Sequence, residues 1–267
     1  MTGSFKARGA FNSLLSAAVP DGGVAAASGG NHGAAVAYAA RRLGHPATIF
    51  VPEIASPAKL AVIADQMADV VVSGERYADA LALCEAHQAK TGAISVHAYD
   101  APATIAGQGT VAAEWEADTG GIDTVLVAVG GGGLVAGIAA WFEGRVKVVG
   151  VEPEGSRALH AALEAGEAVD VPVGGIAADS LGARRTGALN LAIARRYVAD
   201  VVLVPDQAIV DAMRTLWREA RIVTEPGGAA AFAALLSGAY TPEPGERVGV
   251  LVCGANVDMT AFAEISG

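Results

Sequence analysis

The stretch TVLVAVGGGGLVAGIAAWF, residues 124–142, contains the turn that decides the fold. A continuous apolar run at 124–129 predicts a strand, four glycines follow it, and an Ala-rich run at 134–142 predicts a helix. Continuous rather than alternating apolar character is typical of a parallel strand that is covered on both faces. The stretch therefore predicts one strand–turn–helix unit of an α/β fold.

The same order of strand and helix recurs along the chain. Further strands are predicted at 24–28, 47–51, 70–73, 146–151, 201–204 and 248–253, and further helices at 31–43, 77–91, 105–119 and 208–221. This alternation predicts mainly parallel sheets with right-handed crossovers. Ligands of open α/β sheets bind at the carboxyl ends of the strands, so we expect functional residues in the loops that follow strands.

The composition is that of a globular protein with one large domain or two small ones. Of 267 residues, 52% are hydrophobic and 17% are charged, which excludes disorder. The formal net charge is −10, so we expect no nucleic-acid partner. No apolar run reaches the roughly 18 residues that span a bilayer, so no membrane partner is expected. Two cysteines without metal-ligand spacing suit a reducing cytoplasm, which is the predicted location.

The glycine turn at 130–133 predicts a phosphate site. Its four glycines let backbone N–H groups approach an anion closely, and the following helix adds uncompensated donors and a partial positive charge. Neither a Walker lysine nor the spacing of a dinucleotide fingerprint is present. A merely flexible turn between strand and helix is the alternative.

A second loop, SGGNHG at 28–33, also follows a strand and leads into a helix. Its N–H groups and hydroxyl suit a carboxylate, and Asn31 can donate to a ring hydroxyl. The alternative is a helix cap made by Ser28 or Asn31. His32 is either a base or a structural hydrogen-bonding side chain.

Three further side chains suggest ligand chemistry. Lys6, within TGSFKARGA at 2–10, stands between tight-turn residues and an apolar helix-like run, as a catalytic amine would. Glu225 either faces a cofactor ring or stabilises the helix that follows it. Cys253 at the end of the last strand is either a core residue or a contact to a ligand ring. Together with the two glycine-rich loops, they suggest a phosphorylated aldehyde held by a Schiff base.

These segments resemble the pyridoxal-phosphate enzymes of fold type II, the tryptophan-synthase β fold, and in particular the group of threonine/serine dehydratases (ammonia-lyases) and serine racemases. The resemblance spans nearly the whole chain, and the matching pieces occur in family order. It implies two three-layer α/β domains with mainly parallel sheets: a large cofactor-binding domain (1–20 plus 101–267) and a small domain (21–100). It also implies a homodimer. The matching pieces are TGSFKARGAFN at 2–12, SGGNHGAAVAYAARRLG at 28–44, HAYDAPATIAGQGT at 97–110, GGGGLVAGI at 130–138, EPGGAAAFAALL at 225–236 and CGANVD at 253–258.

The resemblance implies pyridoxal 5′-phosphate as the cofactor and gives each site residue a role. Lys6 would form the Schiff base and then move protons at Cα and the leaving group. Phe5 would pack on the cofactor ring, Asn31 would bond its 3′-oxygen, and Cys253 would lie opposite its nitrogen. The phosphate would bind to backbone N–H groups of Gly130, Gly131, Gly132, Gly133 and Leu134. The substrate carboxylate would contact Ser28, Asn31, His32 and Gly33.

The implied reaction is β-elimination of L-threonine or L-serine to a 2-oxo acid and ammonia. Serine racemases carry a second serine, which acts as base on the opposite face, where this chain has Gly29; we therefore favour dehydratase over racemase. Some racemases bind a divalent cation after a Glu-Pro pair, but here Ala158 stands where an acidic residue is expected, so no metal site is predicted. The alternatives are a serine racemase, a dehydratase of another β-hydroxy amino acid, and a truncated non-catalytic domain.

Family members usually have some tens of residues before the lysine motif. We expect Met1 to be a misassigned start and a fuller protein to exist. The resemblance implies the short, catabolic type without a regulatory domain.

Overall fold

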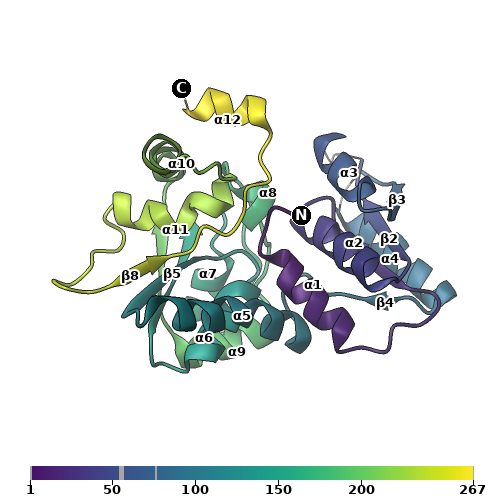
Figure 1. Cartoon of the computed structure of the whole chain (residues 1–267), viewed down its shortest axis with the longest axis horizontal. Coiled ribbons are helices and arrows are strands. Elements are labelled where there is room, and N and C mark those ends of the chain that lie inside the picture. Colours follow the sequence, from purple (N-terminus) through teal and green to yellow (C-terminus); the bar gives the residue numbers. More distant parts are fainter. Residues whose placement is uncertain (1, 54–56, 76, 267) are drawn as a thin grey trace. The chain divides into compact units, whose positions relative to one another are not determined.

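The computed structural model describes residues 2–53, 57–75 and 77–266, which form two compact units, 1–98 and 99–267 (Figure 1). Met1, on which the expectation of a misassigned start rests, lies outside the described residues. The first unit contains α1 (Lys6–Leu15), β1 (Val24–Ala27), α2 (Asn31–Leu43), β2 (Ala47–Val51), α3 (Pro57–Ala64), β3 (Asp69–Val72), α4 (Tyr77–Thr91) and β4 (Ile94–Ser95).

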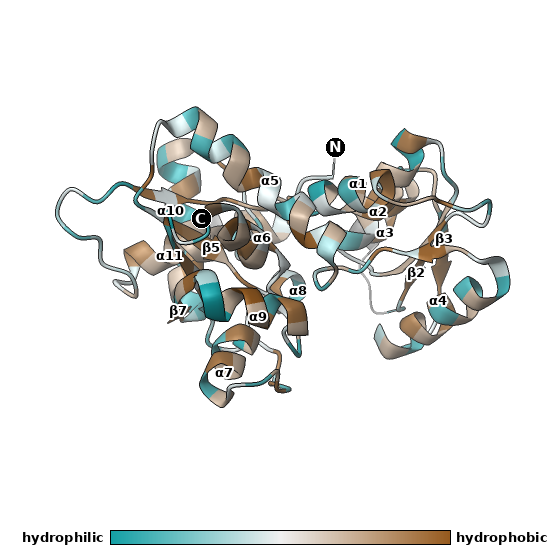
Figure 2. Ribbon diagram, turned by 90° about the horizontal axis from the view of Figure 1, so that it is seen from below, coloured by the Kyte–Doolittle hydropathy of each residue, from teal (hydrophilic) through white to brown (hydrophobic). Residues whose placement is uncertain are grey.

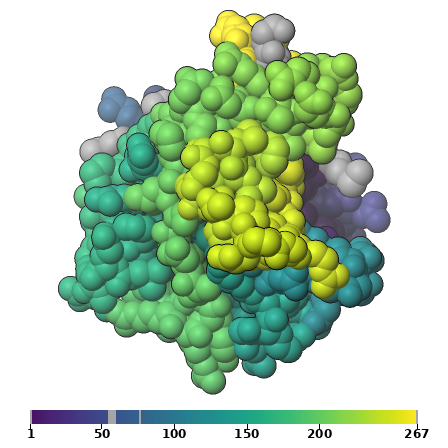
Figure 3. All heavy atoms as spheres, turned by 90° about the vertical axis from the view of Figure 1, so that its left-hand side faces the viewer, coloured from purple at the N-terminus to yellow at the C-terminus, as the bar shows by residue number. Residues whose placement is uncertain are grey.

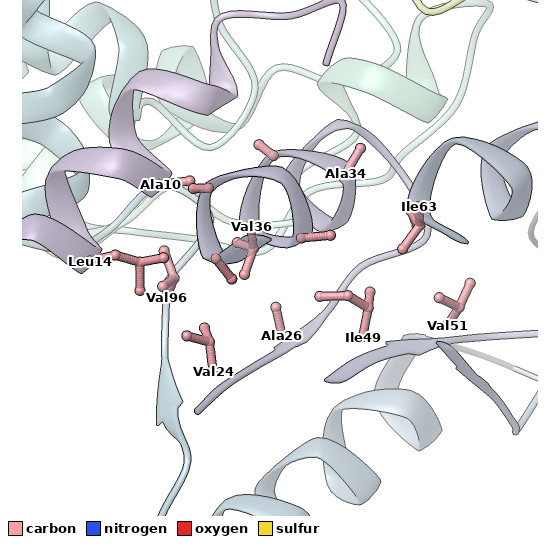
Figure 4. Close-up of a cluster of buried hydrophobic side chains, with 14 residues drawn as sticks. Ala10, Leu14, Val24, Ala26, Ala34, Val36, Ile49, Val51, Ile63 and Val96 are labelled. Atoms are coloured by element: carbon pink, nitrogen blue, oxygen red, sulfur yellow. The ribbon is translucent and has the colours of Figure 1, made fainter. Parts of the chain in front are cut away.

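The four strands of the first unit form one parallel sheet in the order β3-β2-β1-β4. Successive residues of β1 face opposite layers: Val24 and Ala26 pack with α1 and α2, whereas Ala25 packs with Cys84 of α4. This alternation gives three layers, as expected for strands covered on both faces. Figure 4 shows the α1–α2 side of this core, and Figure 2 shows hydrophobic residues along β2 and β3.

Helix α1 belongs to the first unit. Ala10 and Leu14 lie in the core cluster of that unit, and the ring of Phe11 meets that of Tyr38 edge-on at 5.7 Å between centroids. The compact unit that contains α1 also contains residues 21–98, because the apolar face of α1 is buried against α2. The domain bounds implied by the resemblance, 1–20 plus 101–267 and 21–100, stay a prediction.

The second unit has the same kind of sheet, in the order β7-β6-β5-β8, with all pairs parallel. Helices α6 and α11 both pack on β5 and β6, which are almost entirely buried. Its elements are α5 (Pro102–Thr119), β5 (Thr124–Ala128), α6 (Gly133–Phe142), β6 (Lys147–Pro153), α7 (Ala158–Ala165), α8 (Ala178–Leu181), α9 (Ala188–Tyr197), β7 (Val198–Val204), α10 (Asp206–Ala220), α11 (Pro226–Leu236), β8 (Val248–Val250) and α12 (Met259–Ser266).

The C-terminal part of the chain, yellow in Figure 3, lies on the surface of the second unit. Helix α12 is attached to α10: Phe262 meets Trp217 edge-on at 5.9 Å, and Arg214 Nε donates to the carbonyl of Ile265 at 2.6 Å. The predicted α/β class with two mainly parallel sheets is confirmed. Among the described helices, none combines the length and apolar character needed to cross a membrane.

Candidate active site

Lys6 is the first residue of α1, with Phe5 at the N-cap position. Its Nζ donates a 2.8 Å hydrogen bond to the carbonyl of Ala98 and lies 5.2 Å from the centroid of the Phe5 ring. The carbonyl and the ring face restrict the otherwise flexible side chain, because both attract an amine or ammonium group. The predicted nucleophile is therefore an amine held at a helix start, as its position in TGSFKARGA suggested.

Residues 28–30 connect β1 to α2, and residues 31–33 form the first turn of α2. Gly30 is the N-cap residue of α2, and among the described residues no side chain caps this helix start. The Ser28 hydroxyl instead accepts from the N–H of Gly30 at 3.3 Å. A Cβ at Gly33 would lie 2.1 Å from the carbonyl oxygen of Ser28, so only glycine allows this approach of helix and strand. The uncapped N–H groups and the positive end of α2 suit a carboxylate.

His32 is buried, and its Nε2 lies 2.8 Å from the carbonyl oxygen of Val96. A carbonyl can only accept, so Nε2 carries the proton and Nδ1 is the unprotonated nitrogen of the neutral ring. Burial, followed by the positive charge of Lys6, lowers the pKa of His32 from 6.5 to about 3. Of the two alternatives for His32, this geometry favours the structural hydrogen-bonding side chain over a base at neutral pH.

The glycine turn connects β5 to α6 in the second unit. Gly132 is the N-cap residue of α6 with φ +96°, a conformation that favours glycine, and no side chain in the described part of the chain caps this helix start. A Cβ on Gly131 would lie 2.3 Å from the Tyr99 ring, and one on Gly133 would lie 2.6 Å from the Tyr99 carbonyl oxygen. Side chains are therefore excluded at Gly131 and Gly133, and main chain alone forms this helix start, which fits a phosphate.

Cys253 and Glu225 are neighbours in the second unit. Cys253 is buried, and its thiol lies 3.7 Å from the carbonyl oxygen of Gly227, to which it donates. The N–H of Glu225 donates to the Gly254 carbonyl at 3.2 Å, and a Cβ on Gly254 would lie only 2.0 Å from Oε1 of Glu225. Glu225 occupies the N-cap position of α11, yet its side chain makes no capping hydrogen bond within the described residues. Its carboxylate lies beside the Cys253–Gly254 backbone instead.

Glu152 of the Glu-Pro pair caps a helix. Its two carboxylate oxygens accept from the N–H groups of Leu159 and His160, at 2.9 and 2.8 Å, in the first turn of α7. Burial raises the pKa of Glu152 to about 7, although these two hydrogen bonds oppose the shift. Both carboxylate oxygens of Glu152 therefore accept hydrogen bonds from α7. Within the described residues, no cluster of three or more His, Cys, Asp or Glu side chains could hold a metal ion.

Sequence reasoning missed several residues that support the two loops. The carbonyl groups of Val96 and Ala98 hold His32 and Lys6, but a main-chain acceptor has no sequence signal of its own. Tyr99 lies against the glycine turn, and Asn190 donates to the carbonyl of Gly131. Only the start of the quoted HAYDAPATIAGQGT piece pointed to part of this group, and nothing in the sequence pointed to Asn190.

Comparisons with known proteins show the family to which the chain belongs. The family described as "Pyridoxal-phosphate dependent enzyme" matches residues 1–254. A phenylserine dehydratase of Ralstonia pickettii is 39% identical over 100% of this chain and 83% of its own length. An L-threonine ammonia-lyase of Thermotoga maritima is 36% identical over 99% of this chain and 67% of its own. The structure of maize serine racemase matches with a TM-score of 0.93 at 32% identity, covering 98% of this chain and 82% of that one.

The chain belongs to the family of pyridoxal-phosphate dependent enzymes. The predicted cofactor, fold type II and enzyme class are thereby confirmed. The residues present also fit the cofactor, because Tyr99 leaves no room for a Cβ on Gly131 or Gly133, so the turn before α6 is main chain without side chains, and Lys6 supplies a positioned amine.

Proposed function

We propose that this chain is a pyridoxal-phosphate dependent dehydratase that converts L-threonine or L-serine to a 2-oxo acid and ammonia. One observation carries the proposal: the amine of Lys6 and the uncapped start of α2 are both anchored to the segment from Val96 to Ala98. The amine of Lys6 and the candidate carboxylate site at the start of α2 thus belong to one local structure. Relatives that carry the names threonine ammonia-lyase and phenylserine dehydratase support the same reaction class.

The bound cofactor supplies an electron sink that acidifies the Cα–H bond. We assign its covalent attachment, and the movement of the Cα proton, to Lys6. Phe5 would pack on the ring and Asn31 would donate to the ring 3′-oxygen. Cys253 would provide a neutral thiol at the ring nitrogen, with Glu225 beside it. The backbone N–H groups of Gly130, Gly131, Gly132, Gly133 and Leu134 would hold the phosphate.

The substrate carboxylate binds to the start of α2 in this proposal, with contacts from Ser28, Asn31, His32 and Gly33. Elimination removes the Cα proton and the β-hydroxyl, which leaves as water. The resulting enamine takes up a proton at Cβ to become an imine, and water hydrolyses the imine to the 2-oxo acid and ammonia. A neutral group opposite the ring nitrogen stabilises a pyridinium less than a carboxylate would, which suits elimination of a β-leaving group.

Gly29 distinguishes elimination from racemisation in this proposal. Racemisation needs a second base on the face of Cα opposite Lys6, and Gly29 has no side chain to provide one. The structural likeness to maize serine racemase makes racemase the second candidate. Product analysis separates the two: 2-oxo acid and ammonia from L-serine support the dehydratase, whereas D-serine formed faster than 2-oxo acid contradicts it.

The substrate side chain is a separate question. Identity of 39% to a phenylserine dehydratase over the whole chain makes an aryl β-hydroxy amino acid a second substrate candidate. Steady-state measurement of 2-oxo acid from threonine, serine and phenylserine compares the candidates by kcat/KM. The proposal is contradicted if purified protein binds the cofactor but releases no 2-oxo acid from any of the three, as a truncated non-catalytic domain would.

We further propose a cytoplasmic homodimer. Neither cysteine forms a disulfide in the described part of the chain, which suits a reducing compartment. Analytical ultracentrifugation tests the dimer, and cell fractionation tests the location. A monomer at micromolar concentration contradicts the first, and enrichment with membranes contradicts the second.

A further inference from the structure

Three donors converge on the carbonyl oxygen of Gly131, in the middle of the glycine turn. The side-chain Nδ2 of Asn190 donates at 2.9 Å, the hydroxyl of Thr186 at 3.3 Å and the N–H of Gly187 at 3.4 Å. The other hydrogen of Nδ2 is donated to the carbonyl of Tyr99 at 3.0 Å. Asn190 is fully buried, so these bonds are protected from water.

The start of α9, which carries Asn190, is itself fixed by Asp100. The two carboxylate oxygens of Asp100 accept from the N–H groups of Ala188, Leu189 and Asn190, at 3.0, 3.1 and 3.3 Å. A carboxylate at a helix N-terminus satisfies donors that have no partner within the helix and also favours the helix dipole. The Asn190 amide is therefore presented to the turn by an anchored helix.

The geometry of the peptide unit links the hydrogen-bonded carbonyl of Gly131 to the direction of the next N–H group. In a trans peptide the C=O of Gly131 and the N–H of Gly132 point in opposite directions within one plane. Because the carbonyl is directed toward Asn190 and Thr186, the N–H of Gly132 is directed away from them. Gly132 has a left-handed φ of +96°. Glycine has little preference for any one conformation, so the conformation of this turn depends on the hydrogen bonds to the Gly131 carbonyl.

We propose that Asn190 is a positioning residue that orients the glycine turn for the cofactor phosphate, with Thr186 as its auxiliary. The inference rests on the proposed function and adds to it a residue group that does not touch the cofactor. Asn190 suits this role because its side-chain NH2 group carries two hydrogens and donates to both carbonyl oxygens. Its own Oδ1 is buried without a hydrogen-bond partner within the described residues, so its contribution here is as a donor.

The test uses Asn190→Asp, which keeps the shape of the side chain and removes both donated hydrogen bonds. Dissociation constants of pyridoxal phosphate and of pyridoxal, which lacks the phosphate, are measured by absorbance titration of the apo-protein. The wild-type protein prefers pyridoxal phosphate, and we expect Asn190→Asp to reduce this preference about tenfold or more. The 31P chemical shift of the bound phosphate should move as well.

The matched control is Thr124→Val, at the opposite end of the same strand β5. Thr124 is equally buried, and its hydroxyl donates to Glu246, far along the strand from the glycine turn. Thr124→Val should lower Tm without changing the preference for the phosphorylated ligand. Thr186→Val, a milder change, should reduce the preference about threefold and serves if Asn190→Asp fails to fold.

The inference is overturned if Asn190→Asp, or Thr186→Val in its place, leaves the ratio of the two dissociation constants at the wild-type value. It is also overturned if Thr124→Val lowers the ratio equally, because the effect would then be general destabilisation. A wild-type protein that binds neither ligand would contradict the proposed function instead, since the ratio is defined only for a protein that binds.

Discussion

Lys6 and His32 are hydrogen-bonded to carbonyl groups two residues apart on the same segment of chain. Nζ of Lys6 donates to Ala98 and Nε2 of His32 to Val96, both at 2.8 Å. The segment that follows β4 thus fixes the candidate amine and the start of α2 with respect to each other within the first unit.

Removal of the amine should remove the chemistry. Lys6→Ala should abolish the visible absorbance of the holo-protein and lower kcat/KM for threonine about 10³-fold or more, since both attachment and proton transfer are lost. Lys90→Ala, in the last turn of α4, is a matched control that should leave both properties unchanged. An absorbance spectrum that survives in Lys6→Ala would show that another residue carries the cofactor.

His32 should make the protein sensitive to acid. The pKa of His32 is about 3 in the folded protein and about 6.5 in the unfolded chain. The folded protein favours the neutral ring, so the contribution of His32 to stability is fully present above pH 6.5. This stability is lost as the pH falls from 6.5 toward 3, amounting to about 2 kcal/mol at pH 5. Denaturant unfolding of His32→Gln should show a flatter fall between pH 7 and 5. An unchanged slope in the variant would contradict the shift.

Glu152 should act in the opposite direction. Its pKa is about 7 when folded and 4.5 when unfolded, so its contribution is fully present below pH 4.5 and is lost as the pH rises through 7. The loss amounts to about 3 kcal/mol at most between pH 4 and 8. Glu152→Gln should remove this pH dependence, at the cost of one hydrogen bond to the first turn of α7.

The control for Glu152→Gln is Glu164→Gln, an exposed position on the same helix. Its unfolding free energy should follow that of the wild-type protein from pH 5 to 8. If both variants have the same pH profile, Glu152 is not the group that titrates.

Gly29→Ser should introduce a base on the opposite face of Cα. We expect measurable D-serine from L-serine, at about 1% or more of the elimination rate, because a positioned acid–base group contributes about 10²-fold or more. Gly30→Ala is the matched control, since a Cβ at Gly30 meets nothing within 4 Å. Chiral chromatography of the products measures both reactions. Absence of D-serine from a folded, cofactor-loaded Gly29→Ser protein would contradict the assignment of this position.

Local pattern predicted most elements of the fold. The helices at 31–43 and 77–91 have the predicted bounds, because glycines or turn residues flank each apolar run. Strand β4 was missed because it pairs over only two residues, Ile94 and Ser95, too few for a periodic signal. Strand β7 begins earlier than predicted, at Val198, and its pairing with β6 continues past one register shift, where Ala199 of β7 is the extra residue.

Some residues of the candidate site were likewise predictable from the local sequence, and others were not. Loops that follow strands, such as the turn at Gly131 and the start of α2, were predictable because glycine at a strand end is a local signal. Asp100 and Asn190 were not predictable, because each contacts a segment that is remote in sequence. Both residue types are also common in ordinary helix caps. The packing of α1 was not predictable for a related reason, because the face that α1 buries depends on its contacts with α2.

In the proposed site, the starts of α2 and α6, which no described side chain caps, would bind the substrate carboxylate and the cofactor phosphate mainly through peptide N–H groups. Alanine scanning cannot remove a peptide N–H, so a side-chain survey would report these two positions as tolerant even if they supply most of the binding energy. Amide-to-ester replacement at Gly132 or Asn31 deletes a single main-chain donor and would reveal that contribution directly.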